Sequence, residues 1–366
     1  MKTLIIPCGG RSSRFPNMRP KYLLTHPDGE LMIQKAVYCL NLEEFDRVVI
    51  TIVREHVIEY EADLILSQAF CLERNPKFEL IILDDYTFCQ AETIELTLEK
   101  AKIEGEIVVK DSDNFTVFEK NAFSNLQNFI GGLDINHGKR EIFRLGAKSF
   151  LKINNHGIIV DIIEKRIESE IICIGVYGFA SAEIFLEAYR ALKYERGKDN
   201  EIFISHVISY LIATGISVYQ YIEAIDYEDW GTLKDWRNMQ ERFGTYFVDI
   251  DGVLFRNCGK YGSRNWSNSF EVIPENFDVL RKLSNNGAQI IITTSREEKY
   301  REKIMTVFEE QGISIYAMIM DCNHARRTLI NDFAATNPFP SANAINIPRN
   351  SYLDEYLPES VSLIPN

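Results

Sequence analysis

Residues 7–21 of the chain read PCGGRSSRFPNMRPK, and they follow a short apolar run, TLII, at residues 3–6. The apolar run predicts a buried parallel strand, so the glycines lie where a strand gives way to a loop. In α/β proteins this end of the sheet holds ligands. Gly9 and Gly10 allow the backbone to turn and to approach a bulky ligand closely. The segment therefore predicts a ligand-binding loop at the end of the first strand.

Hydroxyl-bearing and cationic side chains accompany these glycines. They are Arg11, Ser12, Ser13, Arg14, Arg19 and Lys21. Hydroxyls and bare backbone N–H groups bind phosphate oxygens, and the cations make the loop a local positive site in a chain of net charge −13. A tight strand-to-helix turn with a solvated basic flank is the alternative interpretation. The Pro20-Lys21 pair that follows favours phosphate binding.

Length and composition limit the classes of protein to consider. The 366 residues are too many for one typical core and enough for two, and 46% hydrophobic with 25% charged residues is ordinary for a soluble globular protein. The excess of 53 acidic over 40 basic residues argues against a nucleic-acid partner. No apolar run is long enough to span a bilayer or to act as a signal peptide, so we expect a cytoplasmic protein without a membrane partner. Seven cysteines without a Cys-x-x-Cys pair are expected to be reduced thiols.

Apolar runs alternate with amphipathic segments over the first two thirds of the chain. Predicted strands cover residues 3–6, 48–52, 78–83, 106–110, 157–165, 174–179 and 217–221, and predicted helices cover residues 31–40, a stretch ending near 70, the segment that begins at 89–94, and residues 182–192 and 201–212. This alternation predicts a mostly parallel sheet with helices on both faces. Residues 121–150 are polar and poorly periodic, and no chemistry is assigned to them.

Two carboxylates follow the predicted strand at residues 106–110. Asp111 and Asp113 lie two positions apart at its carboxyl end, where both can converge on one hard cation, which prefers oxygen ligands. Acidic turns are common, so the pair alone is a weak signal. Its place at a strand end, in a chain that also carries a predicted phosphate loop, favours a site for a hard cation.

These segments, in this order, resemble the sugar-phosphate nucleotidyltransferases, which open with a strand, a glycine-rich loop containing Arg, and a Pro-Lys pair. Cys8 and the serines at 12 and 13 depart from the residues common in that family. The resemblance covers roughly residues 1–240 and implies a Rossmann-like, GT-A-like mixed sheet. It also implies transfer of a nucleoside monophosphate from a nucleoside triphosphate to a sugar or polyol phosphate, with release of pyrophosphate.

The resemblance also implies roles for individual residues. Nucleotide binding falls to Gly9, Gly10, Arg11, Ser12, Ser13 and Gln90, charge neutralisation to Arg14 and Lys21, Mg²⁺ binding to Asp113 and Asp229 with Asp111 in support, and acceptor binding to Glu164 and Lys165. Asp229 is preferred to Asp226 because the segment DWGT at residues 229–232 resembles the family's late Asp-x-Gly-Thr segment. An ordinary helix start at Gln90 and an exposed ion pair at Glu164-Lys165 remain as alternatives.

A second domain is predicted after Gly244. An apolar strand at residues 246–250 leads into Asp249-Ile250-Asp251-Gly252, and the apolar residues 253–255 that follow argue against a calcium loop. The segment resembles the first motif of the haloacid-dehalogenase-like (HAD-like) phosphatases. We therefore expect a nucleotidyltransferase domain at residues 1–243 and a HAD-like Rossmannoid phosphatase domain at residues 244–366. The intervals between its motifs leave no room for a large cap domain, so it is expected to be capless.

The HAD-like resemblance implies Asp249 as nucleophile and Asp251 as general acid and base. Other positions follow the same pattern: Thr294 as phosphate-binding hydroxyl, Arg326 or Arg327 in place of the family's lysine, a short strand at residues 328–332, and Mg²⁺ held by Asp249, Asp332 and the carbonyl of Asp251. Asn331 departs from a pattern in which many members have a second acidic residue beside the late Asp.

Together these features predict a bifunctional enzyme, with surface-polysaccharide precursor synthesis as the setting that the resemblance implies. Three alternatives stay open: a binding protein that senses an activated sugar, a nucleotidyltransferase with an inactive HAD-like domain, and a hydrolase whose phosphatase alone is active. The base, the acceptor, the order of the two reactions and homo-oligomerisation also stay open.

Overall fold

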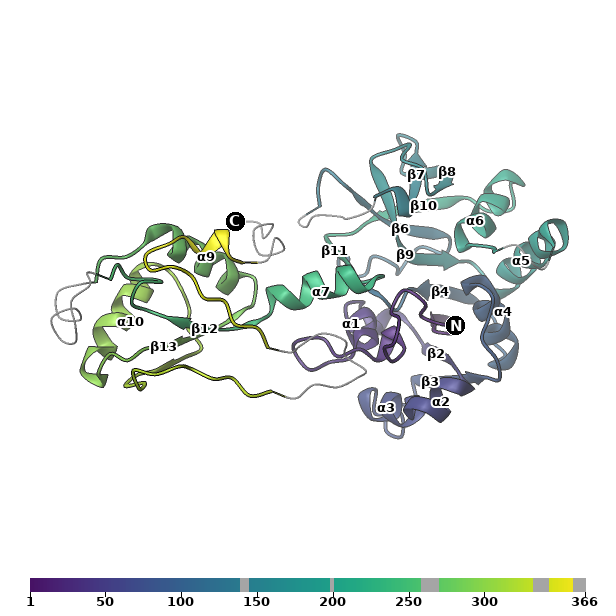
Figure 1. Cartoon of the computed structure of the whole chain (residues 1–366). Helices are drawn as coiled ribbons and strands as arrows, with labels where there is room; N and C mark the ends of the chain where they lie inside the picture. Colours follow the sequence, from purple (N-terminus) through teal and green to yellow (C-terminus); the bar gives the residue numbers. More distant parts are fainter. Residues whose placement is uncertain (139–144, 198–200, 258–269, 332–341, 358–366) are drawn as a thin grey trace. The chain divides into compact units, whose positions relative to one another are not determined.

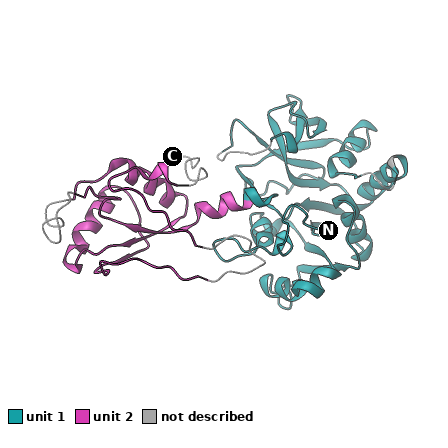
Figure 2. Ribbon diagram, viewed as in Figure 1, with its two compact units in different colours: residues 1–235 teal, residues 236–366 magenta. Residues whose placement is uncertain are grey.

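The computed structural model describes residues 1–138, 145–197, 201–257, 270–331 and 342–357 (Figure 1). The chain forms two compact units, unit 1 at residues 1–235 and unit 2 at residues 236–366 (Figure 2). The division falls within helix α7 (Leu233–Arg242). The assignment of separate functions to residues 1–243 and 244–366 stays a prediction.

Unit 1 is built on a nine-stranded sheet with the order β3-β2-β1-β4-β9-β6-β10-β8-β7. Its strands are β1 (Lys2–Pro7), β2 (Arg47–Val53), β3 (Phe78–Leu83), β4 (Glu106–Lys110), β6 (Phe129–Asp134), β7 (Ser149–Ile153), β8 (Ile158–Glu164), β9 (Ile171–Phe179) and β10 (Tyr219–Glu223). The first four positions in the order are parallel, whereas β9 is antiparallel to both β4 and β6. The sheet is therefore mixed, and the prediction of a mostly parallel sheet holds only for its first half.

Helices cover both faces of this sheet. They are α1 (Met32–Tyr38), α2 (Arg54–Tyr60), α3 (Ala62–Ala69), α4 (Gln90–Lys100), α5 (Ala182–Arg196) and α6 (Ile204–Ala213). Leu4 and Ile6 of β1 belong to a core that includes residues of α1 and α3, while Ile5 belongs to a second core with α4, α5 and α6. Successive side chains of a strand point to opposite faces, so burial on both faces explains the continuous apolar run.

No strand was predicted within residues 121–150, yet β6 lies inside the sheet between β9 and β10. Gly131 and Gly132 lower the strand propensity of this segment, so its sequence does not indicate a strand. A Cβ at Gly131 would lie 2.8 Å from the Phe118 ring, and one at Gly132 would lie 2.8 Å from the carbonyl oxygen of Ile172. Close packing therefore requires glycine at two positions where strand propensity favours larger residues.

Two short antiparallel strands, β5 (Asn114–Val117) and β11 (Asp226–Asp229), form a separate ribbon in unit 1. Their register pairs Asn114 with Asp229. In addition, the Trp230 N–H donates to the Asp113 carbonyl oxygen at 2.8 Å. The ribbon thus brings together two acidic segments that are far apart in the sequence.

Unit 2 contains a parallel sheet of three strands, β12 (Thr245–Asp249), β13 (Gln289–Thr293) and β14 (Ala317–Ile319), with helices α9 (Pro274–Asn285) and α10 (Arg301–Glu310). The expected strand at residues 328–332 is not found in its described part, residues 328–331. Leu329 and Ile330 are 56% and 89% exposed, so this segment lacks the burial that stabilises a strand. Asp332 lies outside the described residues. Within the described ranges, no helix has the length and apolar character needed to cross a membrane.

Candidate active site

The glycine loop begins where β1 ends, and its two glycines have different surroundings. A Cβ at Gly9 would lie 2.8 Å from the hydroxyl oxygens of both Thr87 and Thr93. These two hydroxyls are hydrogen-bonded at 2.6 Å, and the Thr87 N–H donates to the Gly9 carbonyl oxygen at 3.1 Å. At Gly10, by contrast, an added Cβ would meet no described atom within 4 Å. Gly9 is therefore required for packing, whereas Gly10 leaves open space at the loop.

The rest of the loop is fixed by a few local contacts. Ser12 has a left-handed backbone conformation, with φ 49°, and its hydroxyl oxygen accepts the Lys21 N–H at 3.3 Å. The Arg11 guanidinium lies over the Tyr86 ring, 4.3 Å from its centroid. Ser13 is exposed. These contacts place Lys21 beside the loop although nine positions separate it from Ser12.

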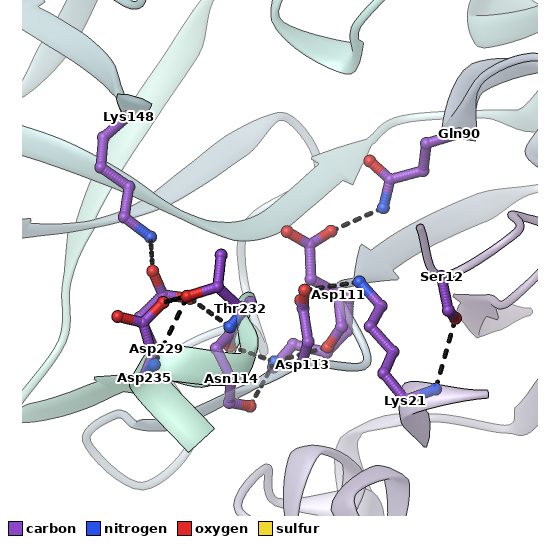
Figure 3. Close-up of polar contacts among 12 residues, drawn as sticks. Ser12, Lys21, Gln90, Asp111, Asp113, Asn114, Lys148, Asp229, Thr232 and Asp235 are labelled. Carbon is purple, nitrogen blue, oxygen red and sulfur yellow. Dashed lines mark hydrogen bonds and ion pairs between the residues drawn. The ribbon is translucent and has the colours of Figure 1, made fainter. Parts of the chain in front are cut away.

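Lys21 forms an ion pair with Asp113 across the site (Figure 3). Its ammonium nitrogen lies 2.6 Å from Asp113 Oδ2. Burial by itself raises the pKa of Asp113, but the charge and hydrogen bond of Lys21 outweigh burial and lower the pKa to about 2. Asp113 is therefore a carboxylate at neutral pH, as a metal ligand must be.

Asp111 is held between α4 and β9. Its Oδ1 accepts a hydrogen bond from the Gln90 side-chain amide at 2.6 Å. A Cβ at Gly175 would lie 2.2 Å from Asp111 Oδ2, and Gly175 has a φ of +75°, so both space and backbone require glycine there. Burial, and then the charge of Asp113, raise the pKa of Asp111. The role of Gln90 at the base stays a prediction, since its described contact is with this carboxylate.

Lys110, a fully buried lysine, hydrogen-bonds to the backbone of the acidic segment at residues 111–114. Lys110 donates to the Asp111 carbonyl oxygen at 2.8 Å, to the Asn114 carbonyl oxygen at 3.0 Å and to the Asn114 side-chain oxygen. Burial lowers the pKa of Lys110. Three acceptors from one short segment fix the turn in which Asp113 lies. The sequence analysis assigned Lys110 only to the strand and missed this contribution.

Arg14, Asp113 and Asp229 converge on Gly231. A Cβ at Gly231 would lie 3.0 Å from Asp229 Oδ1, 3.2 Å from Asp113 Oδ2 and 3.8 Å from an Arg14 terminal nitrogen. Because Gly231 has no side chain, an oxygen of each carboxylate approaches the same position beside it. Carboxylate oxygens are suitable ligands for a hard cation, and Mg²⁺ typically takes one or two carboxylates and completes its shell with water and substrate phosphates. No cluster of three or more His, Cys, Asp or Glu residues that could hold a metal is found among the described residues.

Lys148 is a site residue that the sequence analysis missed. Its ammonium pairs with Asp229 Oδ2 (Figure 3). It also donates to the Tyr227 hydroxyl at 2.9 Å. Burial opposes the charge, but Tyr227 and Asp229 outweigh burial and raise the pKa of Lys148. Lys148 directly precedes β7. That position at the start of an alternating strand is the only sequence signal, and it lies inside the segment judged irregular.

The two predicted acceptor-binding residues have other partners. The Glu164 carboxylate accepts hydrogen bonds from the hydroxyls of Ser149 and Ser205. The Lys165 ammonium lies over the Phe203 ring, 4.1 Å from its centroid. Among the described contacts, neither residue touches Asp113 or Asp229. Their roles at the acceptor stay predictions.

In unit 2, Asp249 and Asp251 lie at the carboxyl end of β12, and each faces an arginine. Arg296 donates from Nε and Nη2 to the two carboxylate oxygens of Asp251, at 3.0 and 2.7 Å. Arg327 Nη2 donates to Asp249 Oδ1 at 3.4 Å. Burial raises the pKa of Asp249, and Arg327 offsets part of that rise. Arg326 is exposed and forms no ion pair with another described residue.

Arg296 is a partner of Asp251 that the sequence did not indicate. It is fully buried, and its guanidinium lies 5.2 and 4.9 Å from the ring centroids of Phe255 and Phe270. The Thr294 hydroxyl oxygen accepts the Arg296 backbone N–H at 3.1 Å. Thr294 therefore helps to position Arg296, and its predicted phosphate contact stays a prediction.

Comparison with known proteins bears on unit 1. No protein-family model and no curated protein matches the sequence. Among solved structures, a nucleoside-diphosphate-sugar pyrophosphorylase from Vibrio cholerae RC9 matches 64% of this chain and 98% of its own, with 22% identity and a TM-score of 0.53. Unit 1 is similar in fold to this pyrophosphorylase. A UDP-glucose pyrophosphorylase solved with UDP-glucose matches 64% of this chain and 96% of its own, with 15% identity and a TM-score of 0.50. The matched share is about the share that unit 1 occupies, and at these identities the likeness concerns the fold alone.

Proposed function

We propose that unit 1 transfers a nucleoside monophosphate from a nucleoside triphosphate to a sugar or polyol phosphate and releases pyrophosphate. The observation that carries this proposal is the convergence of Arg14, Asp113 and Asp229 on Gly231. The glycine loop and Lys21 lie beside it, with Lys21 paired to Asp113. The fold of unit 1 and its likeness to pyrophosphorylases support the same reaction.

The reaction needs positioning and charge rather than a protein nucleophile. An oxygen of the acceptor phosphate attacks the α-phosphorus in line, the bond from the α-phosphorus to the bridging oxygen breaks, and pyrophosphate leaves with that oxygen and the electron pair. Lys21 and Arg14 neutralise the charge that develops on the phosphates, and Asp113 and Asp229 hold Mg²⁺. Bound Mg²⁺ supplies further charge neutralisation on the triphosphate.

A crossed panel of four nucleoside triphosphates and many sugar and polyol phosphates tests this function. Magnesium-dependent pyrophosphate release with at least one pair is the expected result. If no pair releases pyrophosphate but an activated sugar binds tightly, unit 1 is a sensor and the proposal is wrong. If a pair does react, mass spectrometry of the product identifies the base and the acceptor.

Gly231→Ala is expected to weaken binding of Mn²⁺, a spectroscopic substitute for Mg²⁺, on the order of tenfold, because a methyl group would enter the space between the two carboxylates. The added Cβ would lie 3.0 and 3.2 Å from Asp229 Oδ1 and Asp113 Oδ2. Electron paramagnetic resonance of free Mn²⁺ measures the affinity. Gly10→Ala is the matched control, since its Cβ would meet no described atom within 4 Å. Equal Mn²⁺ affinity in Gly231→Ala and the wild type would place the metal elsewhere.

We further propose that unit 2 is a phosphomonoesterase, with Asp249 as nucleophile and Asp251 as general acid and base. The favouring observation is that Asp249 and Asp251 both lie at the end of β12 and each contacts a different arginine. Asp249 attacks the phosphomonoester, the leaving oxygen takes a proton from Asp251, and water activated by Asp251 later hydrolyses the aspartyl-phosphate. Mg²⁺ bound by Asp249, Asp332 and the carbonyl of Asp251 belongs to this proposal. Precursor synthesis for a surface polysaccharide is its proposed setting.

Arg327→Met is expected to shift the acid limb of the phosphatase pH profile to higher pH. Asp249 must be ionised to attack, burial already raises its pKa, and Arg327 lowers it. Loss of Arg327 therefore raises the pKa of Asp249 further, so that at a given acidic pH a larger fraction of the enzyme has Asp249 protonated and is inactive. Measurement of kcat/KM against pH checks this, with Arg326→Met as control. A shift in Arg326→Met instead would assign the role to Arg326.

A further inference from the structure

The Asp229 carboxylate divides its two oxygens between two sides of the site. Oδ2 pairs with the Lys148 ammonium, while Oδ1 accepts the Gly231 N–H at 2.9 Å and approaches the same position beside Gly231 as Asp113 Oδ2. The side chains of Lys148 and Asp229 are only 15% and 17% exposed. Tyr227 gives the ammonium a second partner at 2.9 Å. Lys148 is thus a largely buried cation on a residue proposed to bind metal.

We propose that Lys148 is a positioning residue that exchanges partners during the transfer: its ammonium leaves Asp229 when that carboxylate binds a divalent cation, and it then binds the phosphate of the acceptor. This inference rests on the proposed nucleotidyl transfer. Two positive charges on one carboxylate repel each other strongly in a partly buried site. Lysine is suited to such an exchange because its ammonium is a point charge on a flexible four-carbon stem.

The position of Lys148 in the sheet indicates the acceptor rather than the nucleotide. The glycine loop follows β1, in the parallel half of the sheet, whereas Lys148 precedes β7, which pairs antiparallel with β8 and β9. Lys165 at the neighbouring strand end donates its backbone N–H to the Lys148 carbonyl oxygen at 3.0 Å. The Lys165 ammonium nevertheless lies over Phe203. Of these two adjacent lysines, Lys148 is the one whose ammonium contacts a site carboxylate.

Mn²⁺ binding to the full-length protein without nucleotide tests the exchange directly. Lys148→Met is expected to bind Mn²⁺ more tightly, on the order of tenfold, because the competing ammonium is gone. Lys148→Arg retains the charge and is expected to bind Mn²⁺ as the wild type does. Lys152→Met is the matched control, since Lys152 lies on the same strand in a surface ion pair with Glu168 at 2.8 Å. Unchanged or weaker Mn²⁺ binding in folded Lys148→Met would overturn the proposal.

A second measurement uses the wild-type protein, so it does not depend on folding of a variant. Acetylation of individual lysine amines is followed by peptide mass spectrometry, with Lys152 as the internal reference. Mg²⁺ is expected to raise the labelling rate of Lys148 several-fold, because its ammonium leaves Asp229, and inorganic phosphate is expected to lower that rate again. Labelling of Lys148 that does not respond to Mg²⁺ would contradict the exchange.

Kinetics separate this inference from the function on which it rests. If the wild type releases pyrophosphate, Lys148→Met is expected to raise KM for the acceptor on the order of tenfold and to leave KM for the triphosphate unchanged. Wild-type turnover together with an unchanged acceptor KM in Lys148→Met refutes the role of Lys148 and keeps the function. Absence of turnover from the wild type with every substrate pair refutes the function, while the Mn²⁺ and labelling results still decide whether Lys148 and the metal compete.

Discussion

Lys21→Met is expected to slow pyrophosphate release by about a thousandfold, because removing one positive charge aimed at a developing oxyanion costs roughly two to three orders of magnitude in rate. Methionine keeps most of the length of the side chain and loses only its charge and its hydrogen bonds. The Lys21 ammonium already lies at the site, 2.6 Å from Asp113 Oδ2. Initial rates of pyrophosphate release at saturating Mg²⁺ measure the effect.

The ion pair with Asp113 requires a control for stability. Lys21→Met leaves a carboxylate that is only 13% exposed without its cation, which costs about 1 to 3 kcal/mol of unfolding free energy. The double variant Lys21→Met/Asp113→Asn removes both charges, so its free energy of unfolding, measured with urea, should return most of the way to the wild-type value. Its rate of pyrophosphate release should stay low. A folded Lys21→Met protein with near-wild-type turnover would reject the role of Lys21.

The parallel half of unit 1 was predictable because its signals are local. Leu4, Ile5 and Ile6 are fully buried, as a continuous apolar run predicts for a strand covered on both faces. The loop after β1 was predictable for a similar reason, since glycine, serine and proline residues directly after an apolar run mark the end of a strand. The helical stretch that ends near residue 70 was only partly predictable. It is divided between α2 and α3 at Glu61, which has a φ of 53° that the sequence does not predict.

The contacts of Lys148 were not predictable because they depend on a distant partner. Asp229 lies 81 positions further along the chain, and it reaches the site through the pairing of β5 with β11. Nothing near Lys148 in the sequence indicates that pairing. The two glycines of β6 have low strand propensity, so the sequence around them does not indicate a strand. Close packing against Phe118 and Ile172 is what requires glycine there. Pairing between distant segments determines these features.

Unit 2 shows the same limit. Asp249 and Asp251 were found from a strand followed by Asp-x-Asp-Gly, which is a local pattern. Arg296 was overlooked because an arginine after a strand normally remains in solvent, whereas here two aromatic rings and Asp251 enclose it. The expected strand at residues 328–332 failed because apolar residues alone do not form a strand without neighbours to bury them.

Asp113→Asn is expected to slow pyrophosphate release by at least about a hundredfold, because it removes the charge of a proposed Mg²⁺ ligand while keeping its size. Its backbone contact with Trp230, from the Trp230 N–H to the Asp113 carbonyl oxygen at 2.8 Å, is unaffected by the change, so the fold should persist. Higher Mg²⁺ concentrations should be needed for half-maximal rate. If both the rate and the Mg²⁺ titration match the wild type, the metal binds elsewhere.

Comparison of this single variant with the single variant Asp249→Asn tests whether the two units catalyse separate reactions. Asp249→Asn removes the proposed nucleophile of unit 2, so phosphate release from a phosphomonoester should fall by at least about a thousandfold while pyrophosphate release continues. Asp113→Asn should show the reverse pattern, because Asp113 and Asp249 belong to different units and have different charged partners, Lys21 and Arg327. Circular dichroism confirms that each variant is folded before the rates are compared. One substitution that silences both reactions in a folded protein would mean that a single site serves both. A wild type that releases pyrophosphate and cleaves no phosphomonoester would instead leave unit 2 without catalytic function.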